Sequence, residues 1–269
     1  MSTPTALLAQ GLTKVFFPHT INEVVALNGI SLRVDPGDFI TIIGSNGSGK
    51  STLLNAIAGT VSVTAGTVWL EGKDITKLAE HARARSIGRV FQDPRAGTAP
   101  SMSIQENLAM AYLRGRRRGL RPGVPARLKR QMKEQLAELD MGLETRLTAH
   151  VNKLSGGQRQ AMSLLMATVA EPRLLLLDEH TAALDPKVAA TIMDLTGKIV
   201  QERGLTTLMV THNMEIALQW GNRLIMMHAG RIILDVASAQ KETLTIPGLI
   251  RKFHEVSGET LAVDRMLLE

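Results

Sequence analysis

Residues 39–59, FITIIGSNGSGKSTLLNAIAG, decide the fold that this sequence predicts. FITIIG (39–44) is apolar and rich in β-branched residues, which predicts a short buried strand. GSNGSGKS (44–51) then matches the pattern G-x-x-x-x-G-K-[ST], and the residues from Lys50 to Gly59 predict a helix that the glycine ends. In this strand–loop–helix order, loop N–H groups and the helix N-terminus hold phosphate oxygens. The sequence therefore predicts a phosphate-binding loop, and an ordinary glycine turn is the weaker alternative.

The residue types of this loop each have a physical purpose. Glycine at 44, 47 and 49 lets the backbone adopt positive φ and approach a phosphate closely. Lys50 is expected to reach the outer phosphates, and the Ser51 hydroxyl is expected to ligate Mg²⁺.

A second informative stretch is LLLLDEHTAALDP, residues 174–186. Its leucine run predicts a strand buried on both faces of a parallel sheet. Two carboxylates follow at Asp178 and Glu179, and they are costly there unless they face water or a positive partner. In a phosphate-loop protein the acid ending such a strand holds magnesium, so we expect Asp178 to be a metal ligand. Glu179 then lies where it would orient or deprotonate the attacking water.

Strands and helices alternate along most of the chain, which predicts an α/β fold with a mostly parallel sheet. The helical, charged stretch 103–150 interrupts this order and is interpreted as an inserted lobe. The last 30 residues predict one or two small helices. The other expected strands are 23–34, 66–75, 86–94, 205–212 and two within 223–236, and the other expected helices are 155–170, 187–203 and 213–220.

Composition excludes some classes of protein. The sequence has no cysteine, so disulfides, thiolate metal sites and cysteine nucleophiles are absent. We see no secretory signal and no run of about 20 apolar residues, so a partner chain would have to span any membrane. The net charge is +6, with arginines concentrated in 114–130. That tract is interpreted as a solvated loop and helix start, with lipid headgroups or nucleic acid as alternative contacts, although no aromatic residue interleaves it.

Six motifs occur in order along the chain: GSNGSGKST, the glutamine of VFQDP, LSGGQ, LLLLDE, AALDP and the histidine of VTH. With these motifs the chain resembles the ATP-binding-cassette (ABC) ATPases over about residues 8–236. The resemblance implies a P-loop NTPase with a RecA-like, mostly parallel sheet core, an antiparallel β subdomain and an inserted α-helical subdomain. We expect the ATPase domain at 6–240, its helical subdomain at about 95–170, and a short helical extension at 241–269.

The resemblance also implies roles for single residues. Glu179, His212, Lys50 and Gln92 are the expected catalytic residues. Ser51, Gln92 and Asp178 are the expected Mg²⁺ ligands. Phe16 matches the aromatic residue that stacks on adenine, with Phe17 as a competitor. The complete set of expected nucleotide contacts is Phe16, Ser45, Asn46, Gly47, Ser48, Gly49, Lys50, Ser51, Thr52, Gln92, Ser155, Gly156, Gly157, Gln158 and Asp185.

Two of these matches have a second meaning, and one position departs from the family. Ser155–Gly157 opens a helix, and in the family this helix end caps the ATP held by a partner subunit. Asp185 matches the aspartate that couples the two sites, but a simple helix N-cap is equally compatible with its position. His180 stands where family members commonly have proline, so backbone stiffness or local pH response is expected to differ there.

The implied function is the ATP-hydrolysing subunit of a bacterial importer. Such a subunit works as a head-to-tail dimer, with an identical partner as the default, on the cytoplasmic side of the inner membrane. Its partners are separate transmembrane permease subunits, docking at 91–111 and the lobe after it, and an extracytoplasmic solute-binding protein. The solute is expected to be amino-acid-like or another small organic molecule, and no nucleic acid is expected. The alternatives are an exporter ATPase for lipid or drug, a soluble cassette protein of translation or DNA repair, and a metabolic kinase, which has no use for LSGGQ.

Overall fold

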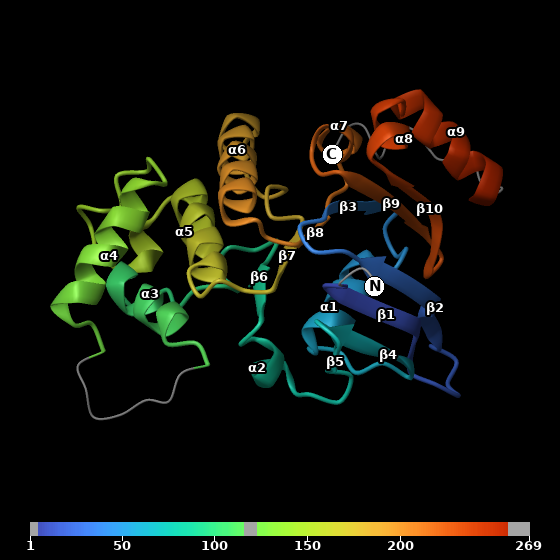
Figure 1. Cartoon of the computed structure of the whole chain (residues 1–269), viewed down its shortest axis with the longest axis horizontal. Helices are drawn as coiled ribbons and strands as arrows, with labels where there is room; N and C mark the ends of the chain where they lie inside the picture. The colour runs from blue at the N-terminus through green and yellow to red at the C-terminus, as the bar shows by residue number, and fades with distance from the viewer. Residues whose placement is uncertain (1–4, 116–122, 258–269) are drawn as a thin grey trace. The chain divides into compact units, whose positions relative to one another are not determined.

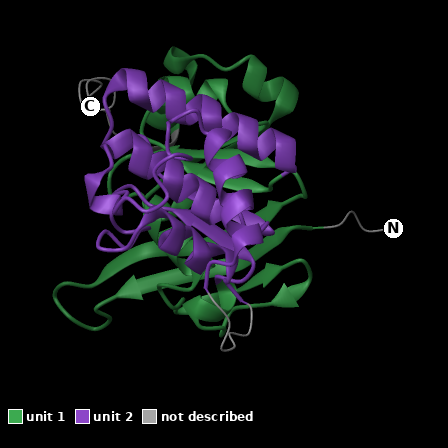
Figure 2. Cartoon of the chain, turned by 90° about the vertical axis from the view of Figure 1, so that its left-hand side faces the viewer, with its two compact units in different colours: residues 1–83, 205–269 green, residues 84–204 purple. Residues whose placement is uncertain are grey.

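The phosphate-loop segment folds as its sequence predicts in the computed structural model, which describes residues 5–115 and 123–257 (Figure 1). Strand β3 (Phe39–Gly44) runs into a tight loop, and helix α1 (Lys50–Ala58) follows and ends at Gly59 in the left-handed conformation. The chain forms two compact units, residues 1–83 with 205–269 and residues 84–204, coloured separately in Figure 2.

The first unit contains a mixed sheet around β3. This strand pairs in parallel with β8 (Thr207–Val210) and with β9 (Arg223–His228). An edge strand, β10 (Arg231–Ala237), is antiparallel to β9. The interior positions of β3 are 0–2% exposed, so the strand is buried on both faces.

The same unit also contains an antiparallel sheet, with strand order β2-β1-β4-β5. Three of these strands lie in segments predicted as extended: β2 (Val24–Val34), β4 (Ala65–Leu70) and β5 (Lys73–Asp74). The central strand β1 (Leu7–Phe16) was not predicted. Register shifts interrupt its pairing with both neighbours, which disturbs the period of two that marks a strand in sequence.

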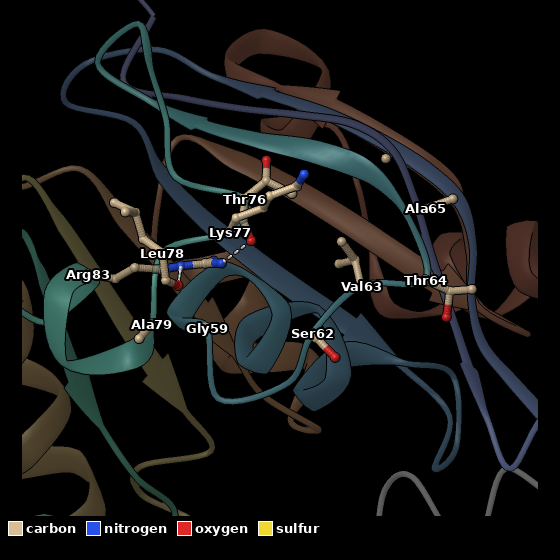
Figure 3. A pocket seen from close by; sticks show the side chains of 11 residues that line it. Gly59, Ser62, Val63, Thr64, Ala65, Thr76, Lys77, Leu78, Ala79 and Arg83 are labelled. Atoms are coloured by element: carbon tan, nitrogen blue, oxygen red, sulfur yellow. Dashed lines mark hydrogen bonds between the residues drawn. The ribbon is translucent and has the colours of Figure 1, made fainter.

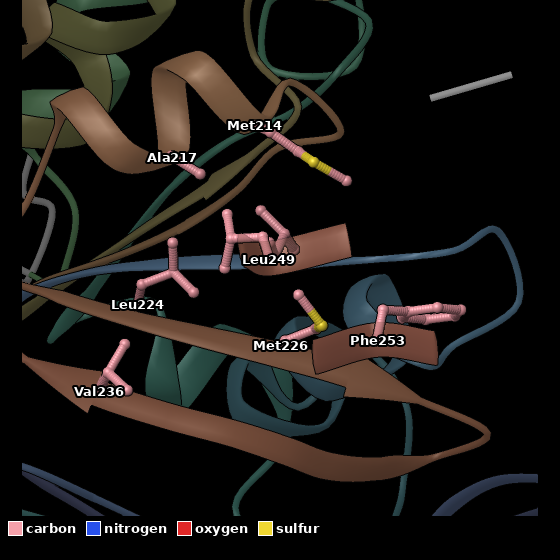
Figure 4. Close-up of a cluster of buried hydrophobic side chains, with 8 residues drawn as sticks. Met214, Ala217, Leu224, Met226, Val236, Leu249 and Phe253 are labelled. Carbon is pink, nitrogen blue, oxygen red and sulfur yellow. The ribbon is translucent and has the colours of Figure 1, made fainter. Parts of the chain in front are cut away.

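Helices α7 (Met214–Gln219), α8 (Ser238–Glu242) and α9 (Ile246–Ser257) complete the first unit together with the short α2 (Glu80–Arg83). Leu249 and Phe253 of α9 are 0% and 2% exposed and belong to one buried hydrophobic cluster with Met226 of β9 and Val236 of β10 (Figure 4). Burying one such side chain contributes about 1.5–3 kcal/mol, so α9 is part of the core of this unit.

The second unit holds two parallel strands and the helices between and after them. Strand β6 (Ile87–Val90) pairs with β7 (Leu174–Asp178), and Leu174 to Leu177 are each 0% exposed. The helices are α3 (Ile104–Tyr112), α4 (Ala126–Ala137), η1 (Val151–Lys153), α5 (Gly156–Thr168) and α6 (Pro186–Arg203).

The arginine-rich tract 114–130 is described only in part, because residues 116–122 lie outside the described residues. Arg114 is partly buried, its guanidinium donates to the Met166 carbonyl at 3.0 Å, and burial lowers its pKa. Arg127, Lys129 and Arg130 at the start of α4 are exposed, as the solvated-helix interpretation predicts. Among residues 5–115 and 123–257, no helix is long and apolar enough to cross a membrane.

Candidate functional site

At both ends of the loop after β3, the surrounding backbone leaves no room for any residue larger than glycine. A Cβ on Gly44 would lie 2.2 Å from the Met227 carbonyl oxygen, and one on Gly49 would lie 2.4 Å from the Ala26 carbonyl oxygen. Both glycines also have positive φ, of 152° and 100°. The close packing beneath the loop therefore requires glycine at these positions, while Gly47 at the exposed tip needs it only for its φ of 77°.

Lys50 is buried inside this loop. Its ammonium donates to the carbonyl oxygens of Gly44 at 2.8 Å and Ser45 at 3.2 Å. The charge is therefore held within the loop, on the first residue of α1. A positive ammonium beside a helix N-terminus is a combination that suits phosphate. Ser51, in the first turn of α1, is exposed.

His212 lies at the same edge of the sheet as this loop. It follows β8, which is parallel to β3, and the Thr211 N–H donates to the Ile42 carbonyl at 3.1 Å. Asn213 caps α7 by accepting from the Ile216 N–H at 2.9 Å, which fixes the turn that carries the histidine. The geometry of the first unit thus brings two expected groups, the loop and His212, to one sheet edge.

Phe16 and Phe17 differ in their surroundings. Phe16 ends β1, is half-buried, and has the Lys14 ammonium 5.0 Å from its ring centroid. Phe17 is 66% exposed and has a φ of 50°, so it lies in the turn after the strand. The partly buried Phe16 is therefore the better candidate for adenine stacking, and its assignment remains a proposal.

A hollow of about 430 Å³ lies elsewhere in the first unit, beside Arg83 (Figure 3). Its buried Arg83 donates to the carbonyls of Ala56, Ile57, Thr76 and Leu78. Two of these carbonyls belong to the last turn of α1, so the guanidinium caps that helix C-terminus.

In the second unit, Gln92, Asp178 and Glu179 lie at one edge of the β6–β7 pair. The two strands are parallel, with Val90 opposite Leu177, so the residues after each strand emerge on the same side. Asp178 is 13% exposed and accepts from the Arg89 guanidinium at 3.1 Å. The same guanidinium lies 4.5 Å from the centroid of the Phe91 ring. Sequence reasoning did not identify Arg89, which supplies positive charge beside the expected metal ligand.

The expected magnesium ligands are hydroxyl, amide and carboxylate oxygens, which are the hard donors that Mg²⁺ takes. Ser51 belongs to the first unit, and Gln92 and Asp178 belong to the second. Among residues 5–115 and 123–257, no group of three or more His, Cys, Asp or Glu side chains is placed to hold a metal ion.

Ser155 and Asp185 both cap helices. The Ser155 hydroxyl accepts from the Gln158 N–H at 3.2 Å, and the Gln158 side chain accepts from the Ser155 N–H at 3.3 Å, which makes a capping box on α5. Asp185 accepts from the Val188 N–H at 3.1 Å and caps α6, so the simpler of its two interpretations holds in the structure. Its coupling role remains a proposal.

His180 is buried, with 2% of its surface exposed. Burial lowers the pKa of this imidazole to about 4, so the side chain is neutral near pH 7. Any change in the charge of His180 is therefore expected at pH values near 4, well below neutrality.

Comparisons with known proteins agree with this geometry. Residues 27–182 match the family model described as "ABC transporter". The chain belongs to the ABC transporter family. The six-motif resemblance is therefore confirmed, and the chain is an ABC ATPase with the P-loop NTPase fold.

Similar proteins include importer and transport cassettes. The chain is 48% identical over 237 residues to the "Tyrosine transport ATP-binding protein" of Clostridioides difficile (strain R20291), covering 88% of this chain and 92% of that one. It is 36% identical to the "Phosphonates import ATP-binding protein PhnC" of Frankia casuarinae, covering 87% and 91%. A dimeric, post-hydrolysis structure of the ATP-binding cassette MJ0796 with ADP and Pi has a TM-score of 0.74 at 29% identity, covering 86% of this chain and 98% of that chain.

Proposed function

We propose that this ABC ATPase drives solute import through separate transmembrane permease subunits, from the cytoplasmic side of the inner membrane. The observation that carries the proposal is the 48% identity, over nearly the full length of both chains, to a tyrosine transport cassette. We further propose an amino-acid-like solute, delivered by an extracytoplasmic binding protein. The methionine and phosphonate import cassettes among its relatives support the importer class over an exporter for lipid or drug.

We propose that two copies of the chain hold two ATP molecules head to tail. The backbone of residues 45–49 and the Lys50 ammonium would bind the phosphates of one ATP, with Phe16 against its adenine. The N-terminus of α5, at Ser155–Gln158, would cap the ATP of the partner. The dimeric form of the MJ0796 cassette supports this arrangement.

The chemistry would then fall to a few side chains. Ser51, Gln92 and Asp178 would hold Mg²⁺, which would neutralise phosphate charge when ATP is bound. Glu179 orients or deprotonates the water that attacks the γ-phosphorus, and ADP is the leaving group. His212 contacts the γ-phosphate, and Asp185 couples one site to the other.

Uptake by reconstituted vesicles tests this proposal. The chain, its permease subunits and its binding protein are placed in proteoliposomes with Mg-ATP on the cassette side, and tyrosine, methionine and a phosphonate are offered as labelled solutes. We expect ATP-dependent accumulation of an amino acid, which Glu179→Gln abolishes. ATP-dependent loss of preloaded lipid or drug, without solute uptake, would instead establish the exporter class.

A further inference from the structure

A buried glutamine ties helix α5 to the two loops that carry Gln92 and Glu179. Gln160 is 0% exposed, and its side-chain amide donates to the His180 carbonyl at 2.6 Å. The same nitrogen lies 3.4 Å from the Phe91 carbonyl oxygen, a longer hydrogen bond. Because these carbonyls belong to the residues directly after Glu179 and directly before Gln92, one side chain holds both loops to the helix that LSGGQ begins.

The His180 side chain makes a second attachment, to helix α6, in addition to the bond that its carbonyl accepts from Gln160. Its Nε2 lies 3.0 Å from the Thr196 hydroxyl, and that hydroxyl donates to the Ile192 carbonyl at 2.7 Å. Since the hydroxyl hydrogen points to Ile192, the oxygen accepts from the imidazole, and Nε2 carries the proton. Thr196 is 0% exposed, so the chain of hydrogen bonds from His180 into α6 is shielded from water.

Residue 180 is therefore held by its carbonyl to α5 and by its side chain to α6. Its neighbour Glu179 has a φ of 44°, in the left-handed region that residues other than glycine rarely adopt. Such a conformation persists only where the surroundings determine it. The hydrogen bonds of the His180 carbonyl and imidazole hold the backbone next to Glu179.

We propose that Gln160, His180 and Thr196 form a clasp that positions Glu179 for hydrolysis and keeps the Gln92 loop in register with it. The three are positioning residues, because they act through the backbone of residues 91 and 180. The proposal rests on the proposed function only for the identity of the reaction, since the clasp itself belongs to the second unit alone.

Amide hydrogen exchange on the full-length, nucleotide-free chain tests the clasp without any ATP. The segment 178–184 contains turn hydrogen bonds from Ala182 to Glu179 and from Leu184 to Thr181. We expect Gln160→Leu and Thr196→Val to speed exchange there about tenfold. The matched control is Thr168→Val, which removes another fully buried threonine hydroxyl that bonds only carbonyls of its own helix. Equal exchange of this segment in wild type and the clasp variants would overturn the proposal.

Kinetics test the positioning role. Thr196→Val should lower kcat about tenfold and leave the KM for ATP within about twofold, because the water-activating group is displaced but the phosphate loop is intact. Thr196→Ser restores the hydroxyl and should restore kcat, and Thr168→Val should keep it. The double variant His180→Phe with Thr196→Val should have a kcat no lower than that of either single variant, because both changes remove the same hydrogen bond.

The outcomes separate the two proposals. A Thr196→Val chain with the kcat of Thr168→Val, or with kcat and KM altered together, would overturn the clasp. A wild-type chain that hydrolyses no ATP, alone or with its permease subunits, would overturn the proposed function, and the exchange experiment would still decide the clasp.

Discussion

Gly157, in the first turn of α5, shows how one residue can have a different purpose from the one its motif suggests. A Cβ at this position would lie 2.4 Å from Cγ1 of Val188 on α6. Valine in a helix is confined largely to one rotamer, so it cannot turn away cheaply. The second glycine of LSGGQ therefore allows α5 and α6 to pack closely, in addition to any contact with a nucleotide.

Gly157→Ala should lower the free energy of unfolding by about 1–3 kcal/mol, because the added methyl overpacks this contact. Urea denaturation of the full-length chain measures the change. Adding Val188→Ala should recover most of the loss, since it removes the clashing methyl group. A Gly157→Ala chain as stable as wild type, but unable to bind ATP, would assign the glycine to the nucleotide instead.

Lys241 should make the folding stability of the chain depend on pH. Its ammonium, 5% exposed, donates to the carbonyls of Trp220 and Gly221, and burial lowers its pKa from 10.5 to about 8. Between these values the unfolded chain binds more protons than the folded chain, so this lysine makes stability rise with pH. The stability of wild type relative to Lys241→Met should therefore increase from pH 8 to pH 10 in urea titrations. A relative stability that falls over this range would contradict the sign of the shift.

At the scale of elements, helix α6 has Asp185 as its N-cap, and the capping and coupling roles of this residue can be tested separately. Asp185→Ala removes the N-cap and should cost about 0.5–2 kcal/mol in urea unfolding, whereas Asp185→Asn keeps a capping oxygen and should cost much less. If the carboxylate also couples the two ATP sites, Asp185→Asn should be stable yet lose positive cooperativity in ATP hydrolysis. Full cooperativity in this variant would leave capping as the only role.

The sequence predicts elements well where one signal is local and strong. Gly59, the cap at Ser155 and the leucine run of β7 each fix a boundary through nearby residues. Strand β1 was not predicted because Gly11, with a φ of 59°, lies where its pairing with β2 is bulged, and this bulge breaks the alternation of apolar residues. The roles of Gln160 and Arg89 were not predicted, because the sequence does not indicate whether a polar residue inside a helix or strand is buried. Their hydrogen-bond partners come from distant segments and are known only from the tertiary structure.

At the scale of the whole molecule, the expected catalytic groups divide between the two units. The phosphate loop and His212 belong to one, and Gln92, Asp178, Glu179 and the LSGGQ segment belong to the other. A chain built in this way has parts that can bind one nucleotide and a separate helix N-terminus that can cap another. The proposed function therefore requires a symmetric pair of chains with two shared sites.

Light scattering on Glu179→Gln tests this central claim most directly. With Mg-ATP the variant should have twice the mass it has without nucleotide, because ATP closes the pair and the missing carboxylate prevents its hydrolysis. Wild type should not hold the dimer under the same conditions. A Glu179→Gln chain that stays monomeric at saturating Mg-ATP, both alone and with its membrane subunits, would contradict the shared-site account.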